Sequence, residues 1–461
     1  MANTIYSHAF LVGCFNGKIK PWMLDKDTKN WKQEIIPNSP QENEKRYDGD
    51  KGYEGLCNVY YKAHIDAMIK AKSQVRPKFL KDVSHYVHTI ENEKQLISLS
   101  RIMVRKDEKG KKIITITHLD DYYLKIVALH VYFFPLDSVF FAIELDDSGS
   151  DFNSLTMGHS WLMNWIWEGD VCFCNNTKKT FKELFAPLIP YLKDKTLSNL
   201  IEGGNKLKMF QIVKYGRNKI DDKLLYELGT SSPIGCVGGN MWLTPSDDYY
   251  NQIKTENAVS AFKNWKGLAL VDSFTMLGTV NSFKPVDCIY MYFPLIYLRC
   301  IFEKYFCFSR NTCYREDKVK GNLMREIAQM EKYYFYNDIS HNFLPNLLYK
   351  AMAKGLCINE EREELAKQIK EKEERNSNLL LGAVSVFAIF SIVYDFYSLI
   401  KAWWAKATFF QINNSDFDLY PILKSVSKEG GELPLFAYIL SILAGIATIS
   451  VIWYLKSQRR R

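Results

Sequence analysis

Apolar and polar positions along the chain predict strands in its first part and helices in its last part. Residues 126–134 and 139–145 are two apolar runs joined by Pro135-Leu136-Asp137-Ser138, a pattern typical of a β-hairpin. Residues 156–167 then carry large apolar side chains at helical spacing. We therefore predict that residues 1–285 form a mixed α/β domain, in which residues 30–51 are a polar loop.

The pattern changes to helix after Pro285. Residues 288–308 form the first long apolar run, but Arg299, Glu303 and Lys304 interrupt it. A charge at the centre of a membrane span costs roughly 2.5–3.5 kcal/mol on insertion scales. This run is therefore predicted to be a helix buried in the protein core.

A strongly charged stretch follows and completes a helical region that we place at residues 286–375. Its sequence EEREELAKQIKEKEER alternates in charge at helical spacing and offers only Leu365 and Ile369 as apolar anchors. The stretch contains neither proline nor glycine, so we predict one continuous stalk helix from about Asn359 to Ile400. A solvated helix is marginal alone, so bundling around a symmetry axis is expected to support it.

Two uncharged runs near the C-terminus are each long enough to cross a bilayer. The first predicted span, residues 376–402, begins with nineteen uncharged residues, and the second, residues 433–455, has twenty-three. About 20 apolar residues in a helix cross the roughly 30 Å of hydrocarbon. Aromatic residues that favour the interface follow the first span and close the second: Trp403, Trp404, Trp453 and Tyr454.

Basic residues predict the orientation of these spans. The tail, residues 456–461, reads KSQRRR, whereas the connecting loop, residues 403–432, has no basic excess. Under the positive-inside rule both chain ends are then cytoplasmic and the loop is extracytoplasmic. The expected location is the cell inner membrane, as a protein with two spans.

Small and polar residues share one face of the first predicted span. Asp395 is an acid inside this span, and an acid in a span suggests a function by default. In an oligomer it would form a ring of carboxylates, which favours cations. It lies near the end of the span, however, and could instead reach interfacial water. The stripe predicts either pore lining or close helix packing. The predicted pore-lining residues are Ser377, Val384, Ala388, Ser391, Asp395 and Ser398. In the second span, Ala437, Ser441 and Gly445 are spaced by four and predict helix packing.

Composition adds little and excludes some classes of function. The net charge of +8 is not gathered into a basic stripe with interleaved aromatic residues, so direct nucleic-acid binding is not expected. None of the ten cysteines forms a Cys-x-x-Cys pair, which predicts buried, reduced thiols.

Sequence motifs of catalysis and of cofactor binding are missing. The chain has no Walker-type phosphate loop and no Gly-x-Gly-x-x-Gly fingerprint. We interpret His85-x-x-His88 as a pair on a surface helix, and His159-Ser160 lacks the context of a nucleophile elbow. Asp146-Asp147 could bind a hydrated cation, but an acidic turn is the commoner outcome. We therefore expect no enzyme and no cofactor.

The predicted layout resembles the CorA-type metal-ion transporter superfamily, most clearly over residues 310–461. The features that carry the resemblance are the α/β domain, the charged stalk helix that runs into a first span, the second span and the basic tail. The resemblance implies a CorA-like fold class: an α/β cytoplasmic domain, a long stalk helix and two C-terminal transmembrane α-helices. It also implies a pentameric funnel whose pore is lined by the first span. The family's Gly-Met-Asn signature occurs nowhere in the chain, which argues against ordinary magnesium transport.

A divergent branch without that signature includes the CorA-like membrane effectors associated with type III CRISPR systems. The chain is similar to them in HVYFFPLDSVFFAIEL, in EKYYFYNDIS and in the stalk-to-span join. The resemblance implies an oligomeric ion channel in antiviral defence, gated when a nucleotide second messenger binds the cytoplasmic domain. The expected partners are the lipid bilayer, further copies of the chain, a nucleotide and a divalent cation.

Two alternatives remain open at this point. The chain could be a divalent-cation transporter with a nonstandard filter at Asp395, or a membrane-anchored scaffold. Loss of Gly-Met-Asn favours the gated channel over the transporter, and the polar stripe argues against a simple anchor. The sequence reveals neither the ligand pocket nor a metal site.

Overall fold

The computed structural model describes part of the chain, in two compact units that divide after Leu365. The described residues are 4–15, 21, 31–34, 83–89, 96–106, 112–117, 124–165, 170–172, 178–180, 207–231, 245–285, 288–315, 323–335, 338–340, 342–372, 374, 377–378, 381–382 and 385. Every element given below belongs to the first unit.

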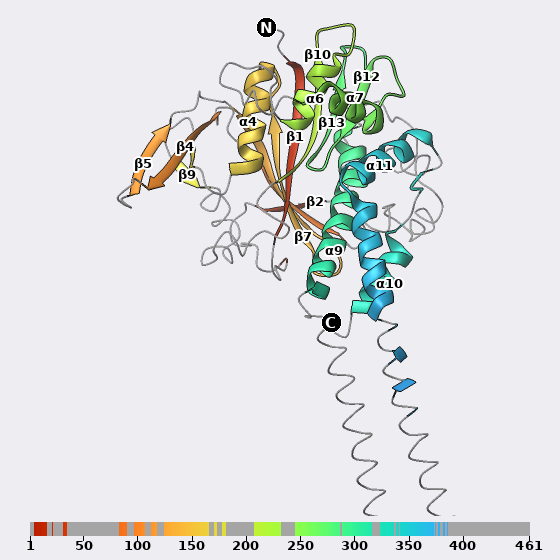
Figure 1. Ribbon diagram of the computed structural model, residues 1–461. Helices are drawn as coiled ribbons and strands as arrows, with labels where there is room; N and C mark the ends of the chain where they lie inside the picture. The colour runs from red at the N-terminus through yellow and green to blue at the C-terminus, as the bar shows by residue number, and fades with distance from the viewer. Residues whose placement is uncertain are drawn as a thin grey trace, which may run out of the picture. The chain divides into compact units, whose positions relative to one another are not determined.

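A mixed β-sheet runs through the middle of this unit (Figure 1). Its strand order begins β11-β12-β13-β10-β1-β7-β6, and only the pair β10 and β13 is parallel among the pairs that involve these strands. The bounds of these strands are β11 (Ala258–Val259), β12 (Trp265–Ala269), β13 (Ser273–Gly278), β10 (Lys208–Tyr215), β1 (Thr4–Cys14), β7 (Val139–Asp146) and β6 (Leu124–Phe133).

Beyond β6 the sheet branches. The strand β3 (Ser84–Thr89) pairs with β6, and β2 (Lys32–Glu34) pairs with β3. On the other branch, β4 (Leu96–Lys106) contacts β6 and leads to β5 (Lys112–Thr117), β8 (Asp170–Cys172) and β9 (Lys178–Thr180).

The predicted hairpin is confirmed by β6 and β7. Their residues pair in antiparallel register, with Phe133 opposite Val139. Leu136 and Asp137 both have positive φ, 61° and 59°, and are the two central residues of the turn. Two positive φ values are the mark of a type I′ turn, whose twist matches that of the flanking strands.

The strand β1 explains the apolar N-terminal sequence. It pairs with β7 on one side and with β10 on the other, so its backbone hydrogen bonds are satisfied within the sheet. Residues 7–14 are all buried, because helices cover both faces of the sheet. A strand covered on both faces has a nearly continuous apolar sequence instead of an alternating one.

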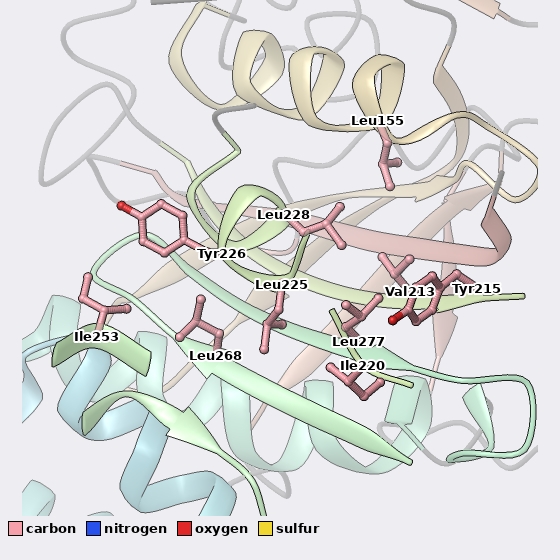
Figure 2. Close-up of a cluster of buried hydrophobic side chains, with 10 residues drawn as sticks. All are labelled: Leu155, Val213, Tyr215, Ile220, Leu225, Tyr226, Leu228, Ile253, Leu268 and Leu277. Atoms are coloured by element: carbon pink, nitrogen blue, oxygen red, sulfur yellow. The ribbon is translucent and has the colours of Figure 1, made fainter. Parts of the chain in front are cut away.

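Helices cover both faces of this sheet. On one face lie α4 (Phe152–Trp165) and α6 (Asp222–Thr230), with α7 (Asp247–Glu256) beside them. Figure 2 shows Leu155 of α4 and Leu228 of α6 pointing toward Val213 and Leu277 of the sheet. On the opposite face are the π-helix η6 (Cys288–Tyr297), α9 (Leu298–Arg315), α10 (Leu323–Tyr333) and α11 (Phe343–Gly355).

Aromatic rings anchor η6 and α9 to their face of the sheet. Phe293 of η6 stacks on Phe10 of β1, with ring centroids 3.8 Å apart, and Phe302 of α9 meets Phe140 of β7 at 6.4 Å. Every side chain described between Phe293 and Phe302 is buried. The prediction that residues 288–308 form a buried core helix is therefore confirmed.

The beginning of the predicted stalk packs against the sheet unit. Residues 358–372 are helical. The Asn311 side-chain amide donates to the Glu361 carboxylate at 2.8 Å, the Arg362 guanidinium lies 4.3 Å from the Phe335 ring centroid, and Leu365 is buried. The first turns of this helix thus have partners within their own chain.

The fold class predicted from the sequence is wrong. We expected an α/β cytoplasmic domain, a long stalk helix and two transmembrane helices of CorA-like type. The structure instead has the mixed sheet with helices on both faces, and none of the helices within the described ranges is long and apolar enough to cross a membrane. The two predicted spans, residues 376–402 and 433–455, lie almost entirely outside the described residues. Local hydropathy, from which they were inferred, does not distinguish burial in protein from burial in lipid.

Candidate functional site

The residues predicted from the sequence to form a site are almost all outside the described part of the chain. Ser377 is described and is a helical, exposed residue. The others lie outside the described residues: Val384, Ala388, Ser391, Asp395 and Ser398 for the pore, and Ala437, Ser441 and Gly445 for helix packing. The structure therefore does not test the predicted stripe.

Four ionisable residues form a chain of hydrogen bonds on the sheet face that η6 covers. Glu144 of β7 receives hydrogen bonds from His8 of β1 and from His130 of β6, each at 2.8 Å to Nε2. His85 of β3 meets His130 through Nε2 and Nδ1 at 3.0 Å. We call these four residues the histidine–glutamate chain.

Strand register explains why these side chains meet. Phe10 lies opposite Glu144, and His130 lies opposite Ala142, two residues before Glu144. Residues opposite each other, and residues two apart on one strand, share a face of the sheet. His85 in turn lies opposite Tyr132, two residues after His130, so all four members project from the same face.

Burial and hydrogen bonding set the charges of this chain. Burial alone raises the pKa of a carboxyl, but hydrogen bonds from His130 and His8 outweigh it and hold the pKa of Glu144 far below its usual range. Glu144 is therefore an ionised acceptor. Burial, together with the nearby His130, lowers the pKa of His85 well below its ordinary value, so His85 is neutral.

These charges fix the tautomers. An ionised carboxylate accepts from the Nε2–H groups of His8 and His130. With a single proton, at Nε2, His130 can accept at Nδ1 from the Nε2–H of His85, and these two nitrogens lie 3.0 Å apart. The remaining nitrogen, Nδ1 of His85, is buried without a hydrogen-bond partner. The histidine–glutamate chain can hold or move protons. Within the described ranges, no set of histidine, cysteine and acidic residues is arranged to bind a metal ion.

A second buried set lies on the opposite face of the sheet. His159 of α4 meets the Asp147 carboxylate at 2.8 Å and the Gln211 amide at 3.1 Å, while the backbone N–H of Lys125 donates to Asp147 at 3.2 Å. Thr275 completes the set by donating to Gln211 at 3.4 Å. These polar groups satisfy one another, and we interpret the set as the anchor of α4 on the sheet.

A pocket opens where α6, α7 and β12 meet. Its floor is apolar and is formed by Leu225, Ala258, Ile253 and Leu268. In Figure 2, Tyr226, Ile253 and Leu268 lie together at one end of the buried cluster. The cavity volume is only about 20 Å³, far below the roughly 300–1,000 Å³ of enclosed small-molecule sites, so a ligand would lie mainly over its rim.

The rim of this pocket combines two aromatic rings with three charges. The rings of Tyr226 and Tyr250 meet edge to face, with centroids 5.4 Å apart. The Asp222 carboxylate receives Lys266 at 2.6 Å and the half-exposed Lys254 at 3.4 Å. The carboxylates of Asp221 and Glu227 also lie close enough to act on the Tyr250 hydroxyl, so the rim carries charges of both signs.

Helix caps hold this rim in place. The Asp221 carboxylate accepts from the backbone N–H groups of Lys223 and Leu224 at the start of α6, and Ser246 accepts from Tyr249 at the start of α7. Capping of this kind satisfies the N–H groups that a helix leaves unpaired. Burial raises the pKa of both Tyr226 and Tyr250, so both rings carry neutral hydroxyls.

Two sequence-based interpretations of histidines and acids are corrected here. His85-x-x-His88 is not a surface helix pair: both residues lie on β3, where His85 is buried and stacks on Tyr132 at 4.3 Å. Asp147 is not an exposed turn residue but a buried partner of His159. A three-residue spacing suits one face of a helix, and only strand pairing shows which neighbour a strand residue meets.

Sequence reasoning missed the histidine–glutamate chain and the pocket. A signal for the first was present, because His8, His130 and Glu144 each interrupt an otherwise apolar strand. No such signal marked the pocket, because its lysines and tyrosines are residue types that are ordinary at the surface of elements such as α6, α7 and β12.

No protein-family model matches this chain, and neither a curated protein nor a solved structure is similar to it. The CorA-like resemblance stays an expectation.

Proposed function

We propose that the chain is a ligand-responsive effector and that its ligand, an anion with a planar ring such as a nucleotide, binds the pocket between α6, α7 and β12. The observation that supports this most directly is the combination of the Tyr226 and Tyr250 rings with the Lys254 and Lys266 ammonium groups around one apolar floor. Among the residues that line this pocket, these two ammonium groups are the ones able to meet an anion.

Each part of the pocket matches a part of such a ligand. A base stacked on an aromatic ring gains about 1–3 kcal/mol, and Tyr250 offers a partly exposed ring. Lys254 and Lys266 provide point charges for a phosphate group. An acid such as Asp222 can accept from ribose hydroxyls, as acids do in dinucleotide-binding folds.

The pocket size limits what it encloses. A cavity of about 20 Å³ does not enclose a ring system, so both the ring and the charged part of a nucleotide would lie at the rim, over Tyr250 and the two lysines. The ligand would then bridge α6 and α7 to β12. To act as a signal, it must bind one of two conformations of the protein more tightly than the other.

Binding can be measured by isothermal titration calorimetry of the full-length protein with AMP and ATP. We expect Lys266→Met to weaken nucleotide binding about tenfold, which corresponds to about 1.4 kcal/mol. Tyr250→Leu is expected to weaken it by a similar factor through lost stacking. The matched control is Lys263→Met, which removes the same charge from an exposed position outside the pocket and leaves the affinity unchanged.

Equal affinities of Lys266→Met and Lys263→Met would contradict the pocket assignment. Absence of binding at millimolar nucleotide would contradict the ligand class and favour the scaffold alternative. The output predicted from the sequence, an ion current through an oligomer in a lipid bilayer, is part of this proposal and has its own test in the Discussion.

A further inference from the structure

The histidine–glutamate chain, His85–His130–Glu144–His8, has two ends of different character. Glu144 has a side-chain exposure of 16%, and His8 and His130 have 10% and 9%. His85 is buried, and its ring stacks on Tyr132 and on His130, with centroids 4.3 and 5.2 Å away.

Counting protons shows where the His85–His130 pair would hold one more. The neutral pair has two ring protons: one in the His85–His130 hydrogen bond and one in the hydrogen bond to Glu144. A third proton, whichever ring carries the charge, must occupy the only remaining nitrogen, Nδ1 of His85. That atom is buried and has no acceptor. A buried donor without an acceptor is costly, so the pair in its present packing resists protonation.

The pair is coupled to the helix above it through one aromatic ring. Phe10 lies against His130, with centroids 5.9 Å apart, and against His8 at 5.2 Å. The same ring stacks on Phe293 of η6 at 3.8 Å. A shift of the imidazoles that gave Nδ1 of His85 an acceptor would therefore change the packing of η6, and π-helical segments are frequent at functional sites.

We propose that the histidine–glutamate chain is a proton-sensitive switch, in which uptake of one proton by the His85–His130 pair loosens the packing of η6 on the sheet. Release of that proton from Nδ1 of His85 restores the neutral pair, while the Nε2–H groups of His8 and His130 point toward Glu144 in both states. The inference is independent of the nucleotide pocket, which lies on the opposite face of the sheet.

Few other ionisable residues lie beside the histidine–glutamate chain on the described strands. By strand register, Tyr6 and Asp146 flank His8, and Lys214 of β10 lies opposite Tyr6. Tyr132 flanks His130, and Glu34 of β2 lies opposite His85. The helix η6 has no acidic or basic residue in its sequence. Acid titration of this region near neutral pH therefore depends mainly on the histidines.

The sign of the pH dependence follows from His85. Its pKa is lowered in the folded protein, whereas a histidine in the unfolded chain titrates near about 6.5. Stability from neutral His85 is thus fully present above that value and falls as the pH drops below it. Glu144 has a depressed pKa as well, so its contribution is lost only at lower pH, below the usual range of a carboxyl.

The test is hydrogen–deuterium exchange by mass spectrometry on the full-length protein at pH 7.5 and pH 5.5, corrected for intrinsic exchange. In the wild type we expect about tenfold faster exchange of η6 peptides at the lower pH, the size that one unpaired buried donor would produce. In His85→Gln the amide can still donate to His130 but does not titrate, and the pH difference should vanish. His88→Gln is the control, because His88 lies on the same strand but does not belong to the histidine–glutamate chain. This variant should retain the difference in exchange between the two pH values.

A second variant, His85→Phe, keeps the ring stacked on Tyr132 and removes both nitrogens, so it repeats the test if His85→Gln is poorly folded. An unchanged pH difference in either variant would overturn the proposal, as would a wild type whose η6 peptides exchange equally at both pH values.

Discussion

Buried charges in α9 show how single residues decide whether an apolar helix can lie inside the protein. The Arg299 guanidinium donates to the Glu303 carboxylate at 2.7 Å, and both side chains are almost fully buried. Arg299 also donates to the backbone carbonyl of Tyr334, and the Tyr349 hydroxyl donates to Glu303 at 3.0 Å. Charges that are expensive in lipid are thus paired and hydrogen-bonded in the core.

Removing one partner of this ion pair should destabilise the protein strongly. We expect Arg299→Met to lower the free energy of unfolding by about 3–5 kcal/mol, because Glu303 would remain buried without its counter-charge. Urea denaturation measures the change. Lys350→Met, which breaks the exposed pair with Asp338, is the control and should cost no more than about 1 kcal/mol. Equal losses in the two variants would show that the buried pair has no special weight.

Close approach between α11 and β12 positions two elements that are far apart in the sequence. Gly355, the last residue of α11, lies so near Ala269 that an added Cβ would come within 2.6 Å of the Ala269 carbonyl carbon. The absence of a side chain at Gly355 therefore permits this contact. Since β12 also supplies Lys266 and Leu268 to the pocket, the same contact supports the pocket wall from the other side.

Adding a methyl group at this contact should separate the two elements. We expect Gly355→Ala to lower the free energy of unfolding by about 1–3 kcal/mol, the usual cost of overpacking. Thermal unfolding followed by circular dichroism would record it. At Gly216 an added Cβ would meet only Ile5 at 3.8 Å, so Gly216→Ala should leave stability unchanged or raise it by up to about 1 kcal/mol. A loss at Gly216 as large as that at Gly355 would refute this explanation.

Long-range strand pairing organises the molecule as far as Leu365. The central strand β1 pairs with β7 and β10, which follow it by more than a hundred residues, and β10 pairs in parallel with β13. Both faces of this sheet are covered, one by α4 and α6 and the other by η6 and α9. The pocket and the histidine–glutamate chain lie on opposite faces, so a ligand and a proton would act through different helical layers.

The predicted output of the whole molecule is an ion current that depends on nucleotide. Full-length protein in planar bilayers, with potassium or magnesium as charge carrier, should be silent alone and conduct after AMP or ATP is added. We expect Asp395→Asn to reduce cation selectivity, because a ring of carboxylates favours cations. The control is Asp416→Asn, an acid within the predicted loop 403–432, which should leave selectivity unchanged.

Two results would contradict this prediction. Magnesium current without nucleotide, weakened by Asp395→Asn, would favour the divalent-cation transporter. Absence of current with every nucleotide tried would favour the scaffold. Because nucleotide affinity is measured independently, this result would contradict the channel without contradicting the pocket.

The sequence by itself determined the local elements of this protein. Apolar runs and turn residues predicted the β6–β7 hairpin, and helical spacing predicted α4, because these signals depend on neighbours within a few residues. The charges of Arg299 and Glu303 were sufficient to predict a buried helix over residues 288–308, and α9 confirms it.

Only the tertiary structure decided which distant residues meet. His8, His85, His130 and Glu144 come from four strands, and strand order and register bring them together. Hydropathy predicted β6 and β7 correctly, whereas the interpretation of His85-x-x-His88 of β3 as a helix pair was wrong. Hydropathy carries no information about strand partners, because pairing is set by contacts between residues far apart in the sequence. The fold class inferred from apolar runs was wrong, since none of the described helices is long and apolar enough to cross a membrane. An apolar sequence shows that a segment avoids water, and only its neighbours in the folded protein show what replaces the water.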